Sequence, residues 1–148
     1  MKDEPLPDTD HISHYCPFGS LLDGGEVTGT SFLLRRDPKR DEEYLSVNWL
    51  EHLRLDNRTA EIAEVRRVLS TKITLGGKAK IAVLNVGNTK DNVRQKSPDR
   101  RDLRILHRPN EPPEFPDPSH SGIFDTLIDE QLVAELIAES VKETYPTR

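Results

Sequence analysis

The stretch at residues 80–86 restricts the fold of this chain more than any other feature. It reads Lys-Ile-Ala-Val-Leu-Asn-Val, a nearly continuous apolar run. A strand with one face in water alternates apolar and polar residues, whereas a strand buried on both faces has no such alternation. We therefore expect an interior β-strand here, with other elements covering both of its faces.

Two further segments have the spacing of amphipathic helices that pack on a sheet. Within residues 59–70, apolar residues recur every three or four positions, at Ile62, Val65, Val68 and Leu69. Near the C-terminus the same spacing joins Leu132, Val133, Leu136, Ile137 and Val141. This second segment follows a helix-start signal at residues 126–129, and Pro146 prevents its continuation. The sequence predicts a helix in each segment, the second of them terminal.

Other segments are typical of β-strands. Residues 11–16 carry apolar residues at near-alternate positions and end at Pro17, which favours a short edge strand. Residues 30–35 and 43–49 are β-prone and flank the polar residues 37–42, so they predict a hairpin with a charged turn. Within the second strand of this hairpin one face is apolar, at Leu45, Val47 and Trp49.

These elements predict an α+β fold: a single domain with a mostly antiparallel or mixed sheet of about five strands packed against two helices, including a C-terminal helix. The 148 residues suffice for one such domain, which we place at residues 11–148. Residues 1–10 hold four acids and two prolines and offer nothing to bury, so we expect a flexible tail. Residues 87–101 are a long polar connection, and residues 103–107 form a further strand.

Five of the eleven prolines fall within residues 109–118. Such a segment sustains neither a helix nor an interior strand, so we expect it to run extended across the surface. Because an extended proline segment is already ordered, it loses less entropy on binding and favours contact with a protein partner. The candidate partner-binding residues are Pro112, Pro113, Phe115, Arg100 and Arg101.

Charge is distributed unevenly along the chain, which has 26 acidic and 21 basic side chains and a net charge of −5. Residues 88–108 contain seven basic residues and three acids, a composition that suits a nucleic acid. Residues 87–114 contain no Phe, Tyr or Trp, however, and so lack the rings on which single-stranded bases stack. An acidic protein partner, or the acidic residues 111–143 of the same chain, explains the basic charge equally well.

Composition also indicates the compartment. No apolar run approaches the roughly 20 residues of a membrane span. The first residues lack the apolar stretch of a signal peptide, and the single cysteine, Cys16, cannot form an internal disulfide. We expect a soluble cytoplasmic protein that has no membrane contact.

The first predicted strand carries donors that zinc prefers. His11, His14 and Cys16 have H-x-x-H-x-C spacing and suit zinc if one further ligand is supplied. A strand places His14 and Cys16 on one face and His11 on the other, so convergence requires a bend. The alternative is an ordinary polar edge strand with a half-buried cysteine. Cys16 as a nucleophile is a weaker hypothesis, because no helix N-terminus is evident to stabilise the thiolate.

Two histidines near the proline-rich segment suggest acid–base chemistry. His107 ends a predicted strand, and His120 follows in Asp-Pro-Ser-His-Ser-Gly, residues 117–122. Placed face to face, two imidazoles act as general acid and general base on a phosphate ester. The alternative is a capping residue at a sheet edge and an ordinary polar turn. The glycine-rich residues 24–31 resemble a phosphate loop in composition but match neither a P-loop nor a dinucleotide motif.

The residues do not identify a known family, so the function rests on these patterns. The leading hypothesis is a small intracellular interaction or regulatory module that binds a protein partner. The alternative is a histidine-dependent hydrolase or transferase acting on phosphate esters, nucleotides or nucleic acid. That alternative predicts at least two imidazoles in one pocket, with a basic side chain nearby.

Overall fold

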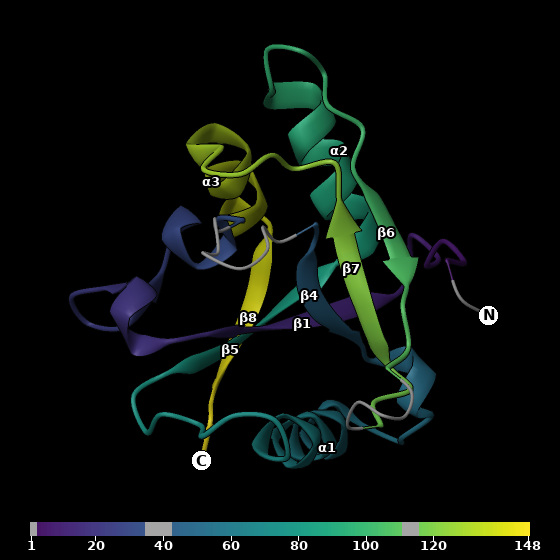
Figure 1. Ribbon diagram of the computed structural model, residues 1–148, viewed down its shortest axis with the longest axis vertical. Coiled ribbons are helices and arrows are strands. Elements are labelled where there is room, and N and C mark those ends of the chain that lie inside the picture. The colour runs from purple at the N-terminus through teal and green to yellow at the C-terminus, as the bar shows by residue number, and fades with distance from the viewer. Residues whose placement is uncertain (1–2, 35–42, 111–115) are drawn as a thin grey trace.

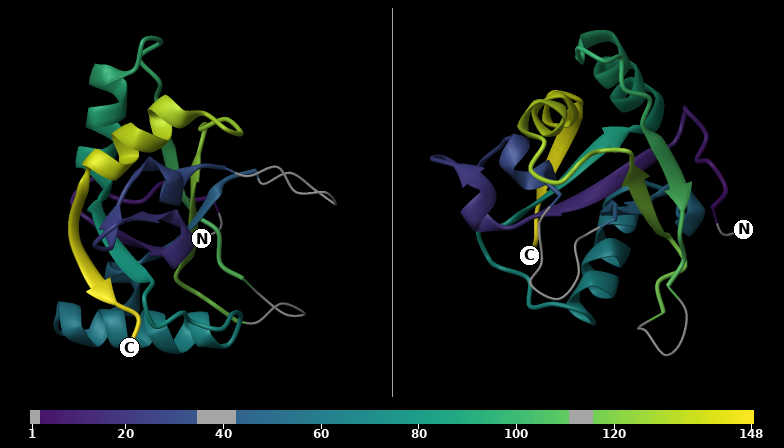
Figure 2. Two further views of the ribbon diagram at one scale, coloured as in Figure 1. Left: turned by 90° about the vertical axis from the view of Figure 1, so that its left-hand side faces the viewer. Right: turned by 45° about the horizontal axis from the view of Figure 1, so that its top comes forward.

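Three layers make up the protein in the computed structural model, which describes residues 3–34, 43–110 and 116–148. A six-stranded antiparallel sheet forms the middle layer. Helix α1 (Arg58–Ser70) covers one face of the sheet, and helices α2 (Val86–Lys96) and α3 (Gln131–Glu139) lie against the other (Figure 1). The side view in Figure 2 separates the same layers. The predicted α+β class with a mostly antiparallel sheet is confirmed.

The strands of the sheet lie in the order β6-β7-β4-β1-β5-β8. Their bounds are β1 His11–Cys16, β4 Leu45–Trp49, β5 Lys80–Asn85, β6 Arg104–His107, β7 His120–Phe124 and β8 Val141–Pro146. Two short strands, β2 (Leu21–Leu22) and β3 (Glu26–Val27), form a separate hairpin. Three 3-10 helices complete the described elements: η1 Phe18–Ser20, η2 Gly29–Phe32 and η3 Glu51–Leu53.

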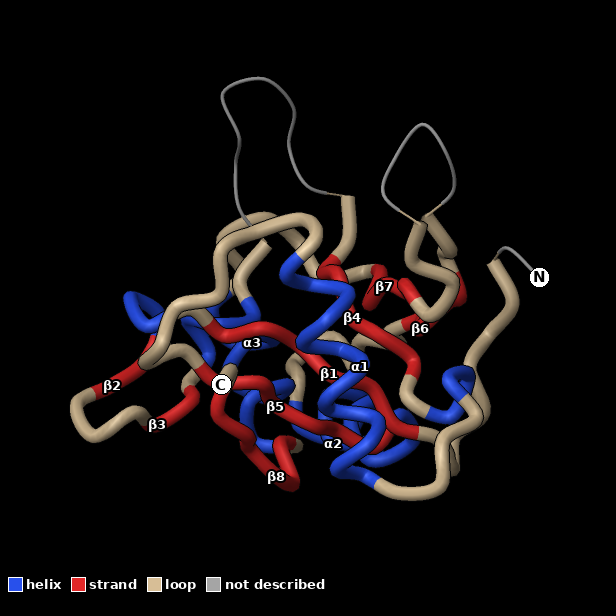
Figure 3. Tube along the Cα trace, turned by 90° about the horizontal axis from the view of Figure 1, so that it is seen from below, coloured by secondary structure: helices blue, strands red, loops and turns tan. Residues whose placement is uncertain are grey.

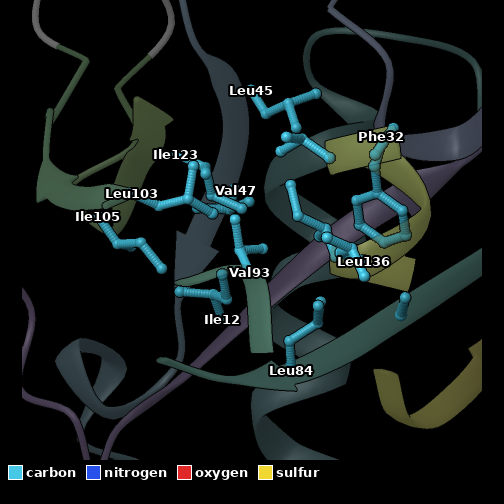
Figure 4. Close-up of a cluster of buried hydrophobic side chains, with 14 of the residues drawn as sticks. Ile12, Phe32, Leu45, Val47, Leu84, Val93, Leu103, Ile105, Ile123 and Leu136 are labelled. Carbon is cyan, nitrogen blue, oxygen red and sulfur yellow. The ribbon is translucent and has the colours of Figure 1, made fainter. Parts of the chain in front are cut away.

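The larger core lies between the sheet and the helices α2 and α3. Alternate residues of the strands point to this side, among them Ile12, Leu45, Val47, Leu84 and Ile123 (Figure 4). Phe32 of η2, Val93 of α2 and Leu136 of α3 pack against them. Burial of these side chains from water is the main force that holds this half of the protein together.

A smaller core lies on the opposite face of the sheet, under α1. Helix α1 crosses that face in the view from below (Figure 3). Ile62 and Val65 of α1 pack there against Ile81 and Val83 of β5. The neighbouring β5 residues, Ala82 and Leu84, belong to the larger core. Strand β5 is therefore buried on both faces, as its apolar run predicted.

Strand β1 is interior, so its prediction as an edge strand is wrong. It pairs with β5 over its whole length, from His11↔Asn85 to Cys16↔Lys80, and with β4 on its other side. Pro17 ends the strand but does not place it at an edge. A proline limits pairing only where its own missing N–H is needed.

The hairpin predicted from residues 30–49 is also wrong. Its second strand is present as β4, but the first segment begins with the 3-10 helix η2. Helix η2 packs on α3, and Leu34 forms a bridge with Ile128 rather than with β4. The β-prone composition of residues 30–35 was overridden by burial of Phe32 and Leu34 in the larger core.

The long polar connection predicted for residues 87–101 is largely helix α2. This helix begins where the Asn85 side chain accepts a hydrogen bond from the backbone N–H of Asn88. It buries few apolar residues, among them Val86 and Val93, so its periodicity in the sequence is weak. Residues 120–124, predicted to lie partly in a turn, form strand β7.

The predicted terminal helix is shorter than expected. Helix α3 ends at Glu139, and the chain continues as the strand β8. Residues 141–146 include Val141, Thr144 and Tyr145, which favour strand structure, and they pair with the open edge of β5. The last element of the chain is therefore an edge strand.

Residues 3–10 are attached to the sheet edge, although we expected a flexible tail with nothing to bury. The N–H of Leu6 donates to the carbonyl oxygen of Ile105, and the N–H of His107 donates to that of Glu4. Leu6 is only 3% exposed and belongs to the larger core. The segment thus covers the outer edge of β6, where unpaired backbone groups attract other chains.

The contact between η2 and α3 leaves no room for a side chain at Gly29, where an added Cβ lies 2.9 Å from the backbone nitrogen of Glu135. We expect Gly29→Ala to lower the free energy of unfolding by about 1–3 kcal/mol, because backbone has to move. Chemical denaturation measures this change. Gly19→Ala is the matched control, since an added Cβ there has no neighbour within 4 Å. Equal stability of the two variants would contradict the described packing of η2.

Candidate functional site

The interior of the sheet is interrupted between β1 and β4. Within the described residues the two strands pair at two positions, Ile12↔Trp49 and Ser13↔Asn48. Beyond Ser13 the ring of His14 lies between them. Its Nδ1 is 2.8 Å from the carbonyl oxygen of Ser46 in β4, and its Nε2 is 2.6 Å from that of Ser31 in η2. A side chain thus replaces the backbone pairing of a normal sheet.

A cavity of about 710 Å³ lies at this interruption, next to the C-terminal end of α1. Its lining comes from segments that are far apart in the sequence: β1, η2, β4, the end of α1 and β7. Polar and aromatic side chains contribute much of the wall, namely Ser13, His14, Tyr15, Ser20, Thr30, Ser31, Tyr44, Ser46, Asn48, Lys72, Asn110 and His120. Leu33, Leu69 and Ile73 add apolar surface.

Alternation along the strands explains why this face of the sheet is polar. Ser13, Asn48 and His120 lie side by side in register across β1, β4 and β7. Their neighbours in the chain, such as Ile12 and Val47, point to the larger core on the other face. Helix α1 covers the β5 side of the polar face and leaves the β4 side to the cavity.

One wall of the cavity is fixed by a buried polar network around Asp117. The Nζ of Lys72 donates to Asp117 at 2.8 Å, and the Nδ2 of Asn48 lies 3.0 and 3.1 Å from the two carboxylate oxygens. The hydroxyl of Ser119 also donates to Asp117, at 3.1 Å. The carboxylate side chain is 1% exposed. The network connects the end of α1 to β4 and to the segment before β7.

Burial of Asp117 raises the pKa of its carboxyl, but the hydrogen bonds from Lys72 and Asn48 outweigh that effect and hold the pKa below its ordinary value. The group is therefore a carboxylate at neutral pH. A buried charge with this many partners has a structural role, because it positions the Lys72 and Asn48 side chains that line the cavity.

Another polar group of the cavity wall, the hydroxyl of Ser13, differs from Asp117 in having no hydrogen bond among the described residues. The Oγ of Ser13 is buried, and among the described residues it makes no hydrogen bond. Ser13 is 1% exposed and lines the cavity. An unsatisfied buried hydroxyl costs about 1–3 kcal/mol, so its presence calls for an explanation.

The far wall of the cavity is aromatic. The Tyr44 ring lies directly over Gly122, where an added Cβ would overlap the ring. It stacks on Phe124 with 4.8 Å between ring centroids and meets the His120 ring edge-on at 5.9 Å. The guanidinium of Arg108 lies 5.6 Å from the Tyr44 ring centre. Gly122 therefore sets the position of Tyr44 against β7.

The two histidines predicted as an acid–base pair lie on opposite faces of the sheet. His107 pairs with Ser121, the neighbour of His120, so their side chains alternate. The Nε2 of His107 donates to the carbonyl oxygen of Pro118, and its ring packs against Trp49 and His52. The Nδ1 of His120 donates to the carbonyl oxygen of Arg108. His120, but not His107, lines the cavity, and His14 and Lys72 line it with His120.

The predicted metal ligands are engaged in separate contacts. The Nδ1 of His11 is 2.6 Å from Glu51, the His14 ring lies between two carbonyl oxygens, and the thiol of Cys16 donates to the carbonyl oxygen of His14. Burial raises the pKa of Cys16 to about 11, which disfavours a nucleophilic thiolate. Across residues 3–34, 43–110 and 116–148, no group of three or more His, Cys, Asp and Glu is placed to hold a metal ion. Zinc binding stays a prediction.

The predicted partner-binding residues are only partly within the described chain. Pro112, Pro113 and Phe115 lie outside the described residues. Arg101 is held in ion pairs with Glu130 and Asp99, and Arg100 occupies a turn with positive φ. At the end of the proline-rich segment the structure differs from the surface position we expected, because Asp117 is fully buried.

The basic charge of residues 88–108 is largely paired within the fold. Six of its seven basic side chains form ion pairs, namely Lys90 with Asp8, Arg94 with Asp91 and Asp102, Lys96 with Glu139, Arg101 with Glu130, Arg104 with Asp125, and Arg108 with Asp3. Three of the acids, Asp125, Glu130 and Glu139, come from the acidic residues 111–143. Attraction within the chain therefore accounts for much of this charge pattern.

Sequence reasoning singled out His14 and His120 but missed the other polar residues of the cavity wall and of the network behind it. Ser13, Ser46, Asn48, Lys72 and Asp117 are common polar residues that match no motif. The one signal present was the alternation in β4, where Ser46 and Asn48 interrupt an apolar series. A strand that becomes interior and yet carries polar residues on one face indicates a polar cavity on that face.

Comparison with protein-family models, with curated proteins and with solved structures found no match for this chain. Among the described residues, no helix has the length and apolar character needed to span a bilayer.

The Asp117 network makes stability depend on pH in acid. Because the folded-state pKa lies below that of an unfolded Asp, near 3.9, the carboxylate stabilises the fold above about pH 4–5, and this stabilisation is lost as the pH falls through the folded-state value. We expect Asp117→Asn to cost roughly 2 kcal/mol at pH 7, and less as the pH falls below 4. Urea unfolding at several pH values measures the difference.

Asp102→Asn is the control for this measurement, because its carboxylate is 78% exposed. We expect its effect on stability to be small at every pH. A cost for Asp117→Asn that is equally small, or that does not change below pH 4, would contradict the described network.

Proposed function

We propose that this chain binds a small polar molecule in the cavity between β1 and β4. The observation that carries the proposal is the Ser13 hydroxyl, which is buried in the cavity wall without a partner in the described chain. A bound molecule that accepts or donates a hydrogen bond there removes the cost of that unsatisfied group.

The size and lining of the cavity support the same proposal. Its volume of about 710 Å³ lies within the range of small-molecule sites, roughly 300–1,000 Å³. Polar groups such as Asn48 and Lys72 are held by the Asp117 network, so they are already positioned before a ligand arrives. Preorganisation of this kind lowers the entropy cost of binding.

Catalysis by histidine remains a second candidate for the same cavity. His120 lines it, and the bond from its Nδ1 to the Arg108 carbonyl fixes the ring and assigns the proton of the neutral ring to Nδ1. In this candidate function His120 transfers protons to or from the bound molecule, while His107, on the other face, takes no part. Binding of a protein partner through Pro112, Pro113 and Phe115 stays a prediction, since these residues lie outside the described chain.

The proposal predicts opposite effects of Ser13→Ala on stability and on binding. Without ligand, we expect the variant to be as stable as the unchanged protein or more stable, by up to about 1–2 kcal/mol, because an unsatisfied hydroxyl is removed. For a molecule found by thermal-shift screening of polar metabolites, we expect about tenfold weaker binding. Calorimetry measures the affinity, and thermal unfolding measures the stability.

Thr126→Val is the matched control. The Oγ1 of Thr126 is also buried without a partner among the described residues, but Thr126 does not line the cavity. This variant should gain stability in the same way and bind the ligand unchanged. The proposed function would be contradicted if Ser13→Ala and Thr126→Val bound the ligand with equal affinity. It would also be contradicted if no polar metabolite in the thermal-shift screen raised the melting temperature.

A further inference from the structure

We propose that the ligand of this cavity is a neutral ring with a cyclic amide edge, an N–H and a carbonyl group side by side, and that Asn48 and Ser13 recognise this edge. Lactams, and the pyrimidine and purine bases that contain one, form this chemical class. The inference rests on the proposed function, since it names the class of molecule that the same cavity takes. It is carried by the fixed orientation of the Asn48 amide and by the register of β1 and β4.

The buried Asp117 network fixes the orientation of the Asn48 amide. A carboxylate accepts hydrogen bonds and donates none. The amide atom that lies 3.0 and 3.1 Å from the two carboxylate oxygens of Asp117 is therefore the donor, Nδ2. Ser119 requires the same orientation, because its hydroxyl donates to Asp117 and so accepts from Asn48, at 2.8 Å. Together these contacts exclude the flipped amide.

With Nδ2 used in this way, the Oδ1 of Asn48 is the polar atom of the side chain that is left for a ligand. None of the hydrogen bonds of Asn48 within the described chain uses Oδ1, and Asn48 lines the cavity. An amide oxygen accepts hydrogen bonds and donates none. A molecule that bonds to it has to bring an N–H or O–H donor. An anion such as a carboxylate or a fully ionised phosphate brings none.

Ser13 lies beside this acceptor. Ser13 and Asn48 are directly opposite each other in the register of β1 and β4, on the polar face of the sheet. The Cβ atoms of such a pair are about 4.5–5.5 Å apart. The Ser13 hydroxyl can donate as well as accept, and it makes no hydrogen bond among the described residues. The wall therefore offers an acceptor next to a donor, and the N–H and carbonyl of a cyclic amide complement them.

The rest of the lining favours a flat ring over a sugar. A vicinal diol also donates and accepts, but a sugar carries further hydroxyl groups around its rim. Against Leu33, Leu69 and Ile73, which line the same cavity, those hydroxyls would be buried without partners. Tyr44 lines the cavity as well, and an aromatic side chain packs well on a planar ring.

Matched pairs of compounds test the inference on the unchanged protein. Hypoxanthine is compared with 1-methylhypoxanthine, uracil with 1,3-dimethyluracil, and 2-piperidone with 1-methyl-2-piperidone. Methylation removes the N–H donor and keeps the carbonyl group. We expect at least one parent compound to bind about tenfold or more tightly than its methylated form, because the Asn48 oxygen then loses its donor. Calorimetry at pH 7 measures the affinities, and glucose and inorganic phosphate are tested alongside.

A variant of Asp117 tests whether this positioning residue sets the preference through Asn48. In Asp117→Asn the new amide offers a donor as well as an acceptor, so it no longer holds Asn48 in one orientation. We expect the preference for the parent compound to fall from about tenfold to nearly none. Asp102→Asn, outside the cavity lining, should keep the full preference. If Asp117→Asn does not fold, the compound pairs on the unchanged protein decide the question.

The possible failures are distinct. Methylated compounds that bind as well as their parents, no binding by any parent compound, or a full preference that persists in folded Asp117→Asn would overturn the inference of a cyclic amide. If glucose, phosphate or another polar molecule binds instead and Ser13→Ala weakens it, the proposed function stands without this inference. Binding of a cyclic amide that Ser13→Ala leaves unchanged would place the ligand elsewhere and overturn both.

Discussion

The central constraint in this structure is the place of the His14 ring between β1 and β4. In a continuous sheet the carbonyl oxygen of Ser46 would accept a backbone N–H from the neighbouring strand. Here the imidazole ring donates instead, and its second nitrogen holds η2 through Ser31. The ring thus supplies hydrogen-bond partners to the carbonyl oxygens of Ser46 and Ser31 where the two strands separate. The cavity, and with it the candidate function, depends on this substitution of side chain for backbone.

The remainder of the fold stabilises the separated strands. The larger core, with Phe32 and the helices α2 and α3, closes one face of the sheet. On the other face α1 packs over the β5 side of the sheet. Lys72, just after the C-terminal end of α1, donates a hydrogen bond to Asp117. This buried ion pair, bonded also to Asn48, fixes the cavity wall without filling the cavity. Rigid walls, and a Ser13 hydroxyl that makes no hydrogen bond among the described residues, are the features on which the proposed binding of a ligand rests.

The spacing of apolar residues predicted helices and strands correctly where the buried residues recur with the period of that element. The helix at residues 58–70, the interior strand β5 and the strand β4 were evident from spacing alone. The patterns were misleading where tertiary contacts override local preference. Residues 29–32, within or beside a segment of β-prone composition, form η2 against α3. Helix α2 was not predicted, because it buries few apolar side chains and most of its residues are polar. The cationic residues suggested a partner surface, but most of them are paired with acids of the same chain.

The sequence by itself determined which side chains share a face of each strand, because alternation is a property of the extended backbone. It therefore contained the polar series that begins at Ser46 and Asn48. Only the tertiary structure decided that Ser13, Asn48 and His120 adjoin one another, and that His14 bridges two carbonyl oxygens. Strand order and register arise from pairing between segments far apart in the chain, and local spacing contains no information about such pairing.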